Sequence, residues 1–391
     1  MPTDPLSIES LCDGLENPGG VIAFEHAAAG RVVFGAGKIE VVGAEAAALG
    51  AKRVLVVTDP GIAKTGAVTR AVASIERAGL AATVYDAVRE NPTTEDVDRC
   101  VVVARAAGTD LLVGLGGGSS LDTAKGCNFL LSNGGRMQDY WGVGKANRPM
   151  LPFLAIPTTS GTGSECQSFA LIADAETHAK MACGDPKAAA AVAILDPELT
   201  LTMPFAVTAH TGIDALAHAL ETAVCNKRSA VSSAYSAAAW KMLDEGLEQV
   251  LQHPDDLAAR AQMLLGAAFA GTAIENSMLG IAHSCANPLT ARFGIIHGQA
   301  VGTMLPRVIS FNERDPATAA IYASLAGEGR LADRVRFHLA RCAMDFSLDD
   351  LGVEEAMLPT LAVEAAAQWT AQFNPVPVTP ALLEEVYRDA F

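Results

Sequence analysis

The sequence predicts an α/β domain with a mostly parallel sheet, followed by an all-helical domain. Strand-like and helix-like segments alternate over roughly the first 200 residues, whereas helical periodicity with almost no strand-like runs continues from about Pro204 to the end. The chain has 391 residues, 50% of them hydrophobic, which is too long for one ordinary core. We therefore expect two domains, residues 1–203 and 204–391, with residues 1–25 as an N-terminal extension.

Short β-branched runs predict the strands of the first domain. The run RVLVVT ends at Asp59-Pro60-Gly61, which is typical of a buried strand that meets a turn. The strands are expected at residues 53–58, 82–86, 110–115, 153–156 and 192–195, and the helices at 67–78, 97–107 and from about 120. Strands that alternate with helices favour a mostly parallel sheet covered on both faces.

The second half is rich in Ala and Leu with helical periodicity. Proline and glycine are interpreted as breaks between its helices, at Pro254, Gly271, Gly280, Pro288, Pro306 and Pro316. The segment Thr211–Glu221 is expected to start a helix.

Composition narrows the class of protein. Lys and Arg number 28 and Asp and Glu 44, a net charge of −16, which disfavours binding to nucleic acid or anionic lipid. No run of 18 apolar residues lacks a charge or turn former, and the N-terminus lacks a secretion signal, so we expect a cytoplasmic protein without a membrane span. Eight scattered Cys without a CxxC pair are expected to be reduced thiols.

Residues 111–125, LLVGLGGGSSLDTAK, follow the order strand, glycine turn, helix. Glycines let backbone N–H groups approach a pyrophosphate, and a helix N-terminus adds a positive field. The spacing G-x-G-G-G-S differs from the G-x-G-x-x-G fingerprint, so a tight strand–helix turn without a ligand is the alternative.

Two further features lie at strand ends, where open α/β sheets bind ligands. Asp59 can accept hydrogen bonds from an adenosine ribose and would repel a 2′-phosphate, which favours NAD over NADP; a turn-forming Asp before Pro is the alternative. The cluster PTTSGTGSE, residues 157–165, follows the strand at 153–156.

A possible metal site lies in the second half. Asp214 and His218 are i and i+4 on one helix face, and His283 and His297 follow in largely apolar surroundings. One carboxylate and three imidazoles suit Fe²⁺, Zn²⁺, Co²⁺, Ni²⁺ or Mn²⁺. Taken singly, each residue is more simply a hydrogen-bonded core residue.

The sequence resembles the iron-containing (group III) alcohol dehydrogenases. The resemblance rests on GGGSSLDTAK (116–125), PTTSGTGSE (157–165), DPELT (196–200), TGIDALAHALE (211–221) and the spacing of His283 and His297, and it runs from about Arg31 to the last helix. It implies the fold shared with dehydroquinate synthase, an N-terminal dinucleotide-binding domain and a C-terminal helical domain.

The resemblance also implies site residues. The metal ligands would be Asp214, His218, His283 and His297, holding iron, with zinc as the alternative. The NAD-binding residues would be Asp59, Asn91, Gly117, Gly118, Ser119, Asp122, Thr158, Thr159, Phe169, Lys180 and Leu199. A homodimer or higher homo-oligomer is also expected.

Three positions depart from the family pattern near the expected substrate pocket. Asn287 replaces a common His, so that residue cannot relay a proton; Ile296 replaces a Pro, and Arg292 an aromatic residue. Arg292 would suit an acidic aldehyde, although a surface Arg is the simpler interpretation. His210 is a candidate for the proton relay.

The expected reaction is reversible hydride transfer between a primary alcohol and NAD, with the metal polarising the substrate oxygen and the nicotinamide between the domains. The alternatives are a maleylacetate-reductase-like enzyme or another reductase of an acidic oxo or aldehyde substrate, a lyase resembling dehydroquinate synthase, and a non-catalytic relative. The retained Asp and three His argue against the maleylacetate-reductase-like enzyme, which acts without a catalytic metal. The intact ligand and phosphate-loop residues argue against the non-catalytic relative.

Overall fold

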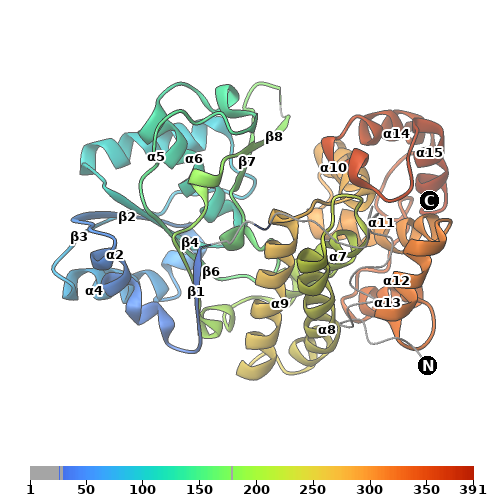
Figure 1. Cartoon of the computed structure of the whole chain (residues 1–391), viewed down its shortest axis with the longest axis horizontal. Coiled ribbons are helices and arrows are strands. Elements are labelled where there is room, and N and C mark those ends of the chain that lie inside the picture. Colours follow the sequence, from blue (N-terminus) through green and yellow to red (C-terminus); the bar gives the residue numbers. More distant parts are fainter. Residues whose placement is uncertain (1–25, 27–29, 178) are drawn as a thin grey trace, which may run out of the picture. The chain divides into compact units, whose positions relative to one another are not determined.

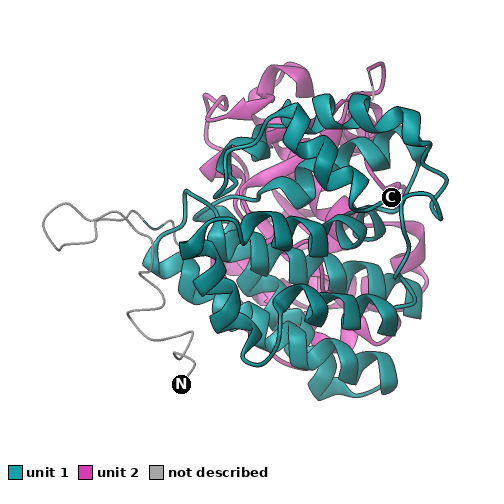
Figure 2. Cartoon of the chain, turned by 90° about the vertical axis from the view of Figure 1, so that its right-hand side faces the viewer, with its two compact units in different colours: residues 1–27, 204–391 teal, residues 28–203 magenta. Residues whose placement is uncertain are grey.

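The structure, a computed structural model, describes residues 26, 30–177 and 179–391. These residues form two compact units, one with residues 30–203 and the other with residues 204–391 and His26 (Figure 2). The expected N-terminal extension, residues 1–25, and Cys12 lie outside the described residues.

A six-stranded, entirely parallel sheet forms the centre of the first unit, in the order β1-β9-β6-β4-β2-β3. Its strands are β1 (Arg31–Phe34), β2 (Arg53–Val57), β3 (Ala81–Tyr85), β4 (Leu111–Gly116), β6 (Phe153–Pro157) and β9 (Val192–Leu195). Every residue of β4 and β6 is buried, as expected for central strands covered on both faces. The predicted fold class is confirmed, and each of the five predicted strands overlaps an observed one.

Helices cover both faces of this sheet (Figure 1). They are α2 (Val42–Ala48), α3 (Pro60–Ala63), α4 (Ala67–Arg77), α5 (Thr94–Ala107) and α6 (Gly118–Asn133), with the 3₁₀ turns η1 (Lys38–Val41), η2 (Met137–Tyr140), η3 (Ser164–Cys166), η4 (Pro186–Ala188) and η5 (Pro197–Thr200). Alternate residues of β2 enter opposite cores: Val54 and Val56 pack with α2 and α4, and Leu55 and Val57 pack with α5 and α6. The strand period therefore fixes which helices lie on which face.

A small second sheet consists of β5 (Gly142–Val143), β8 (Lys180–Gly184) and β7 (Phe169–Ala173), in that order. Strands β7 and β8 pair antiparallel, with Phe169 opposite Gly184 and Ala173 opposite Lys180. The sequence analysis missed this sheet and also β1.

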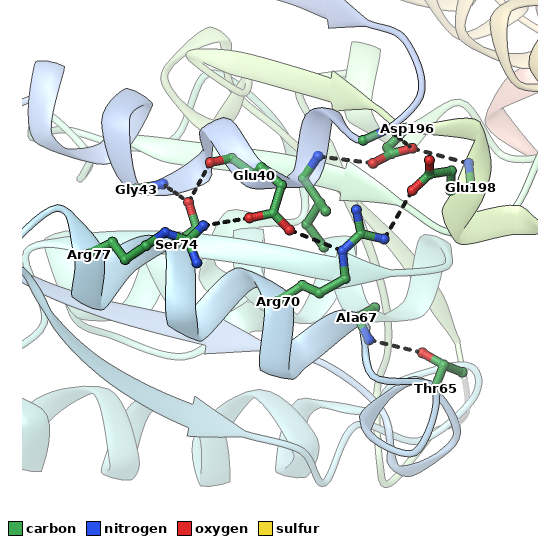
Figure 3. Close-up of polar contacts among 11 residues, drawn as sticks. Glu40, Gly43, Thr65, Ala67, Arg70, Ser74, Arg77, Asp196 and Glu198 are labelled. Atoms are coloured by element: carbon green, nitrogen blue, oxygen red, sulfur yellow. Dashed lines mark hydrogen bonds and ion pairs between the residues drawn. The ribbon is translucent and has the colours of Figure 1, made fainter.

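The DPELT segment has a structural role at the end of β9 (Figure 3). The carboxylate of Asp196 accepts hydrogen bonds from the backbone N–H groups of Gly37 and Ile39 and caps η5. Arg70 of α4 joins Glu40 to Glu198 at 3.1 Å each. These contacts hold the helices of one layer against the end of the sheet.

The second unit is helical, and its described residues contain no strand. Its helices are α7 (Phe205–Val224), α8 (Ala230–Gln252), α9 (Leu257–Glu275), α10 (Ile281–Phe293), α11 (His297–Asn312), α12 (Pro316–Ala326), α13 (Leu331–Arg341), α14 (Leu358–Ala366) and α15 (Pro380–Arg388), with the turns η6 (Glu355–Met357) and η7 (Trp369–Phe373).

Some predicted helix limits are wrong. Gly271, Pro288 and Pro306 lie inside α9, α10 and α11, because these positions are buried in the helical core and tertiary packing outweighs their low helix propensity. The segment Thr211–Glu221 does not start a helix but lies in the middle of α7, which begins after Pro204.

Two helices of this unit are mostly buried. All residues of α7 from Gly212 to Val224 are buried, as expected for a helix at the centre of a core. Among the described helices, α9 alone is long and apolar enough to cross a membrane, but most of it is buried within this unit. Its residues Met263, Ala267 and Ala270 belong to the same core, so α9 is a core helix.

Candidate functional site

Helix α7 carries the first two candidate metal ligands on one face. Asp214 and His218 are one turn apart, and Nε2 of His218 lies 3.6 Å from Oδ1 of Asp214. Both side chains are buried in the helical core. A carboxylate is costly to bury without a partner of opposite charge, so this position requires one.

The other two imidazoles come from the beginnings of α10 and α11. Nε2 of His283 lies 3.3 Å, and Nε2 of His297 3.8 Å, from the same Oδ1 of Asp214. The rings of His218 and His283 stack with their centroids 4.8 Å apart. Three ring nitrogens from three helices therefore converge on one carboxylate oxygen.

The spacing of these atoms suits a metal ion. Ligand atoms of Asp214, His283 and His297 lie within 4.8 Å of one another. Metal–ligand bonds of about 2.1 Å in a tetrahedral site place ligand atoms about 3.4 Å apart. Asp214, His283 and His297 are therefore spaced to hold one divalent cation, whereas His218 lies outside this group although its Nε2 is 3.6 Å from Oδ1 of Asp214.

The charges of the site also suit a cation. Burial raises the pKa of the Asp214 carboxyl, but the surrounding imidazoles outweigh this and hold it well below its usual value. Burial lowers the pKa of His283, but the carboxylates of Glu221 and Asp214 raise it to about 9 in the metal-free protein. A proton on His283 thus balances buried carboxylate charge in the metal-free protein, and a divalent cation can replace that proton.

The three positions that depart from the family pattern have different surroundings. Asn287, one turn after His283 on α10, is half-buried and donates a hydrogen bond from Nδ2 to Oε1 of Gln368 at 3.2 Å. Arg292 is exposed and forms a two-bond ion pair with Glu364. Ile296 precedes α11 and is exposed. Because Glu364 already binds its guanidinium, Arg292 fits the simpler interpretation of a surface Arg.

The glycine turn between β4 and α6 has no room for side chains at Gly116 and Gly118. Gly116 has φ 154°, and a Cβ there would lie 2.4 Å from Oγ of Ser120. A Cβ on Gly118 would lie 2.8 Å from Cγ2 of Thr162. Gly117 forms the N-cap of α6 without any side-chain cap, which leaves the first N–H groups of a long helix available to an anion.

Asp59 and Asn91 flank this turn. Oδ1 of Asp59 accepts hydrogen bonds from the N–H groups of Gly61 and Ile62 and caps α3, while Oδ2 accepts a hydrogen bond from Oγ of Ser120 at 3.4 Å. Asn91 adopts a left-handed conformation, with φ 51°, and its N–H donates to Oγ of Ser119 at 3.2 Å. Asp59 therefore forms the turn, as the alternative interpretation holds, and also contacts the glycine loop.

Hydroxyl groups gather at the ends of the neighbouring strands. Thr158 follows β6, and its N–H donates to the carbonyl oxygen of Gly116 at 3.0 Å, while the side chain of Thr159 approaches Gly117. The hydroxyls of Thr58, Thr158 and Ser160 are buried without a hydrogen-bond partner in the protein. Buried hydroxyls usually have partners, so these three fit a site that a polar ligand completes.

A buried polar cluster ties α6 to the second loop. Oγ of Ser164 donates to Asp122 at 2.7 Å, and Nζ of Lys125 donates to the carbonyl oxygens of Ser164 and Phe169 at 2.6 and 2.9 Å. Burial raises the pKa of Asp122, which the charges of Lys125 and Lys180 partly offset. The sequence analysis missed Lys125 and Ser164, although both lie in its motifs.

Of the last three proposed cofactor residues, Phe169 belongs to the buried cluster through its carbonyl oxygen, which accepts from Lys125. The charge of Lys180 acts on Asp122 of the same cluster. Phe169 and Lys180 lie at opposite ends of the β7–β8 ladder, and Lys180 is exposed. Leu199 is buried in η5 as part of the core beneath α2 and α4. The other eight lie on the glycine turn, on the loops that contact it, or in the Ser164 cluster.

Comparison with known proteins places both halves of the chain in one group. Residues 29–197 match the family model "Iron-containing alcohol dehydrogenase", and residues 208–391 match "Fe-containing alcohol dehydrogenase family, C-terminal". The NAD-dependent methanol dehydrogenase of Bacillus methanolicus is 34% identical over 370 residues, which cover 92% of this chain and 97% of that protein.

Solved structures agree with the sequence comparison. The crystal structure of a 1,3-propanediol oxidoreductase has a TM-score of 0.91 at 30% identity and covers 94% of this chain and 100% of its own. The sulfoacetaldehyde reductase from Bifidobacterium kashiwanohense in complex with NAD+ has a TM-score of 0.85 at 26% identity, covering 95% and 99%.

Proposed function

Because the chain belongs to the iron-containing alcohol dehydrogenase family, we propose that it catalyses reversible hydride transfer between a primary alcohol, or its aldehyde, and NAD. The observation that carries this proposal is the convergence of Asp214 and three imidazoles, from α7, α10 and α11, around one carboxylate oxygen in a member of this family.

We propose that Asp214, His218, His283 and His297 hold the metal, iron in the cell with zinc as the alternative. Carboxylate and imidazole donors suit both ions, and availability decides between them because intrinsic affinity favours zinc. A bound divalent metal supplies Lewis acidity that lowers the pKa of the alcohol hydroxyl. The four side chains fix its position, and the apolar core around α7 excludes water from one side of it.

We propose that the glycine turn and its flanking loops bind NAD. The uncapped N-terminus of α6 would bind the pyrophosphate through its backbone N–H groups. Asp59 would accept from the ribose and repel a 2′-phosphate, which favours NAD over NADP. The hydroxyls of Thr58, Thr158 and Ser160, which lack protein partners, support a polar ligand here.

The proposed substrate is a small neutral alcohol or aldehyde. The relatives' names include methanol, 1,3-propanediol and sulfoacetaldehyde, so an acidic aldehyde is the second candidate. The ion pair of Arg292 with Glu364 weakens the feature that suggested an acidic substrate. If the ratio of kcat/KM for neutral and anionic aldehydes is the same in wild type and Arg292→Ala, Arg292 has only a surface role. If Arg292→Ala loses activity only on anionic aldehydes, the acidic aldehyde becomes the favoured substrate.

The proton relay is a separate question because Asn287 cannot titrate. His210, one turn before Asp214 on α7, remains our candidate for it. An unchanged pH–rate profile in His210→Ala would eliminate His210.

We also propose that the protein works in the cytoplasm as a homodimer or larger homo-oligomer. The seven described Cys are free and buried, which suits a reducing compartment. Cell fractionation and light scattering of the purified protein would test the two statements.

One experiment tests the main proposal. The purified protein is analysed for metal, and NADH oxidation is measured over a panel of aldehydes with Fe²⁺ and Zn²⁺ in parallel. We expect bound metal and turnover of neutral aldehydes that stops when a chelator removes the metal. Turnover of an oxo acid without metal would favour the maleylacetate-reductase-like alternative. Bound metal without NADH turnover would leave the lyase-type alternative. Protein with neither metal nor NADH turnover would refute the proposal and leave the non-catalytic alternative.

A further inference from the structure

Glu221 is a buried carboxylate that contacts a candidate metal ligand. It lies on α7, seven residues after Asp214, and only 3% of its surface is exposed. Its Oε2 lies 2.5 Å from Nδ1 of His283, and its Oε1 accepts a hydrogen bond from the N–H of Ala282 at 2.6 Å. Both carboxylate oxygens are therefore used at the beginning of α10.

The contact with Glu221 determines which nitrogen of His283 carries the hydrogen and which keeps a free lone pair. A carboxylate can only accept, so Nδ1 of His283 must carry a hydrogen and donate it to Glu221. In the neutral imidazole, Nε2 then has the free lone pair. Nε2 is the atom that lies 3.3 Å from Oδ1 of Asp214, so the lone pair points to the place where a metal would bind.

The second contact anchors the helix that carries His283. Gly280, the N-cap of α10, has no side chain to accept from the first N–H groups. Glu221 takes that role from α7 through the N–H of Ala282, and the positive end of the helix dipole favours a carboxylate there. One side chain thus fixes both the position of His283 and the orientation of its ring.

We propose that Glu221 is a positioning residue for the metal: it fixes the tautomer and orientation of His283 and supplies the second negative charge of the site. Asp214 and Glu221 together carry a charge of −2, which balances one divalent cation among three neutral imidazoles. This inference rests on the proposed metal-dependent function. Carboxylates that hold a metal-ligating His in this way commonly raise metal affinity about 10- to 100-fold.

The helical unit offers a matched control. Asp244 of α8 accepts from Nε2 of the buried His338 of α13 at 2.6 Å and also binds Arg334. Like Glu221, it is a carboxylate that joins two helices through a buried imidazole, but neither Asp244 nor His338 belongs to the candidate metal group. Asp244→Asn therefore measures the structural cost of removing such a charge.

The test compares wild type, Glu221→Gln and Asp244→Asn. Gln keeps the size of Glu but has one acceptor oxygen, so it loses either the His283 or the Ala282 hydrogen bond. The affinity for Zn²⁺ and Co²⁺ is measured by competition with a chelator, and thermal unfolding is measured on the metal-free proteins. We expect metal affinity to fall about 10- to 100-fold in Glu221→Gln and less than about twofold in Asp244→Asn, with the Co²⁺ absorption spectrum changed only in the former.

Four outcomes overturn the inference. Equal metal affinity in Glu221→Gln and wild type would show that Glu221 only anchors α10, and an equal loss in Asp244→Asn would show a general effect of destabilisation. A wild-type chain that binds no divalent metal would refute the proposed function together with this inference. If Glu221→Gln does not fold, Glu221→Asp takes its place, because the shorter side chain keeps the charge but withdraws it from His283. A metal affinity of Glu221→Asp equal to that of wild type would also overturn the inference.

Discussion

The close approach of α7 and α11 gives a direct test of how the metal site is held. Gly298 is the second residue of α11, immediately after His297. A Cβ on Gly298 would lie 2.2 Å from the backbone oxygen of His210, and 2.7 and 2.9 Å from its carbonyl carbon and Cα. In Gly298→Ala, the methyl group would meet the backbone of α7, which cannot rotate away as a side chain can.

The size of the effect follows from these distances. Ordinary contacts begin near 3.4 Å, so the start of α11 must move away from α7 by about 1 Å. Overpacking of this kind costs about 1–3 kcal/mol. Metal ligands tolerate displacements of only about 0.2 Å, so His297 would have to leave the metal to relieve the strain. If all of the strain appears as lost metal affinity, the loss is about 5- to 150-fold.

Gly302→Ala is the matched control on the same helix. A Cβ on Gly302 would meet side-chain atoms and no backbone: Cδ2 of Leu339 at 2.7 Å, which can rotate, and Cγ2 of Ile213 at 2.9 Å. Both substitutions gain the same helix propensity, about 1 kcal/mol, so propensity cancels in the comparison. Chelator competition gives the metal affinity of each variant, and calorimetry of the metal-free proteins gives their stability.

The expected result is a metal affinity at least about fivefold lower in Gly298→Ala than in Gly302→Ala. The reasoning is refuted if the two variants bind metal equally well. It is also refuted if Gly298→Ala loses stability but keeps the wild-type metal affinity, because α11 could then move without displacing His297.

Three further predictions concern the first unit. Asp59→Asn keeps an N-cap for α3 but removes its charge, so the preference of kcat/KM for NAD over NADP should fall by about 1 kcal/mol, about fivefold, without loss of stability. Burial raises the pKa of Glu165 to about 7, above its usual 4.5, so the folded state binds more protons and stability should fall as pH rises between these values. In urea unfolding, wild type should lose about 3 kcal/mol more stability than Glu165→Gln between pH 4.5 and 7.5. Lys125→Met leaves the buried carbonyls of Ser164 and Phe169 without their donor, so it should cost about 3 kcal/mol of stability and raise KM for NAD, and wild-type values for both would contradict a role for Lys125.

The local sequence pattern of each strand explains which strands the sequence predicts. The strands β2, β4, β6 and β9 consist of apolar runs of four to six residues that end in turn residues, and this short length and these flanking residues favour buried parallel strands. The segments of β7 and β8, FALIA and KMACG, are short and Ala-containing, so they have no clear period. Their pairing depends on tertiary contacts such as the bonds from Lys125, which local patterns do not contain.

The residues of the candidate metal site are likewise only partly predictable from the sequence. The i, i+4 spacing of Asp214 and His218 indicates one helix face, but no spacing rule relates them to His283 and His297. Residue type and apolar surroundings made the four a possible metal site, and the resemblance then implied that they are the ligands. Glu221 was overlooked because a Glu near the end of a helix normally faces solvent. Its role depends on the N-terminus of α10, sixty residues later, so only the structure reveals it.

The unequal exposure of the four candidate ligands has a consequence for how metal enters and leaves. Asp214 and His218 lie on α7, inside the folded core, and their side chains, like that of His283, are less than 10% exposed, whereas 25% of the His297 side chain is open to solvent. The metal-free chain should therefore fold first and fill a preformed socket afterwards, unlike a zinc finger, whose folding requires the ion. Metal exchange should therefore proceed by movement of the His297 side chain away from the ion. The rate of this movement, more than the stability of the fold, should set how long one ion stays in the protein.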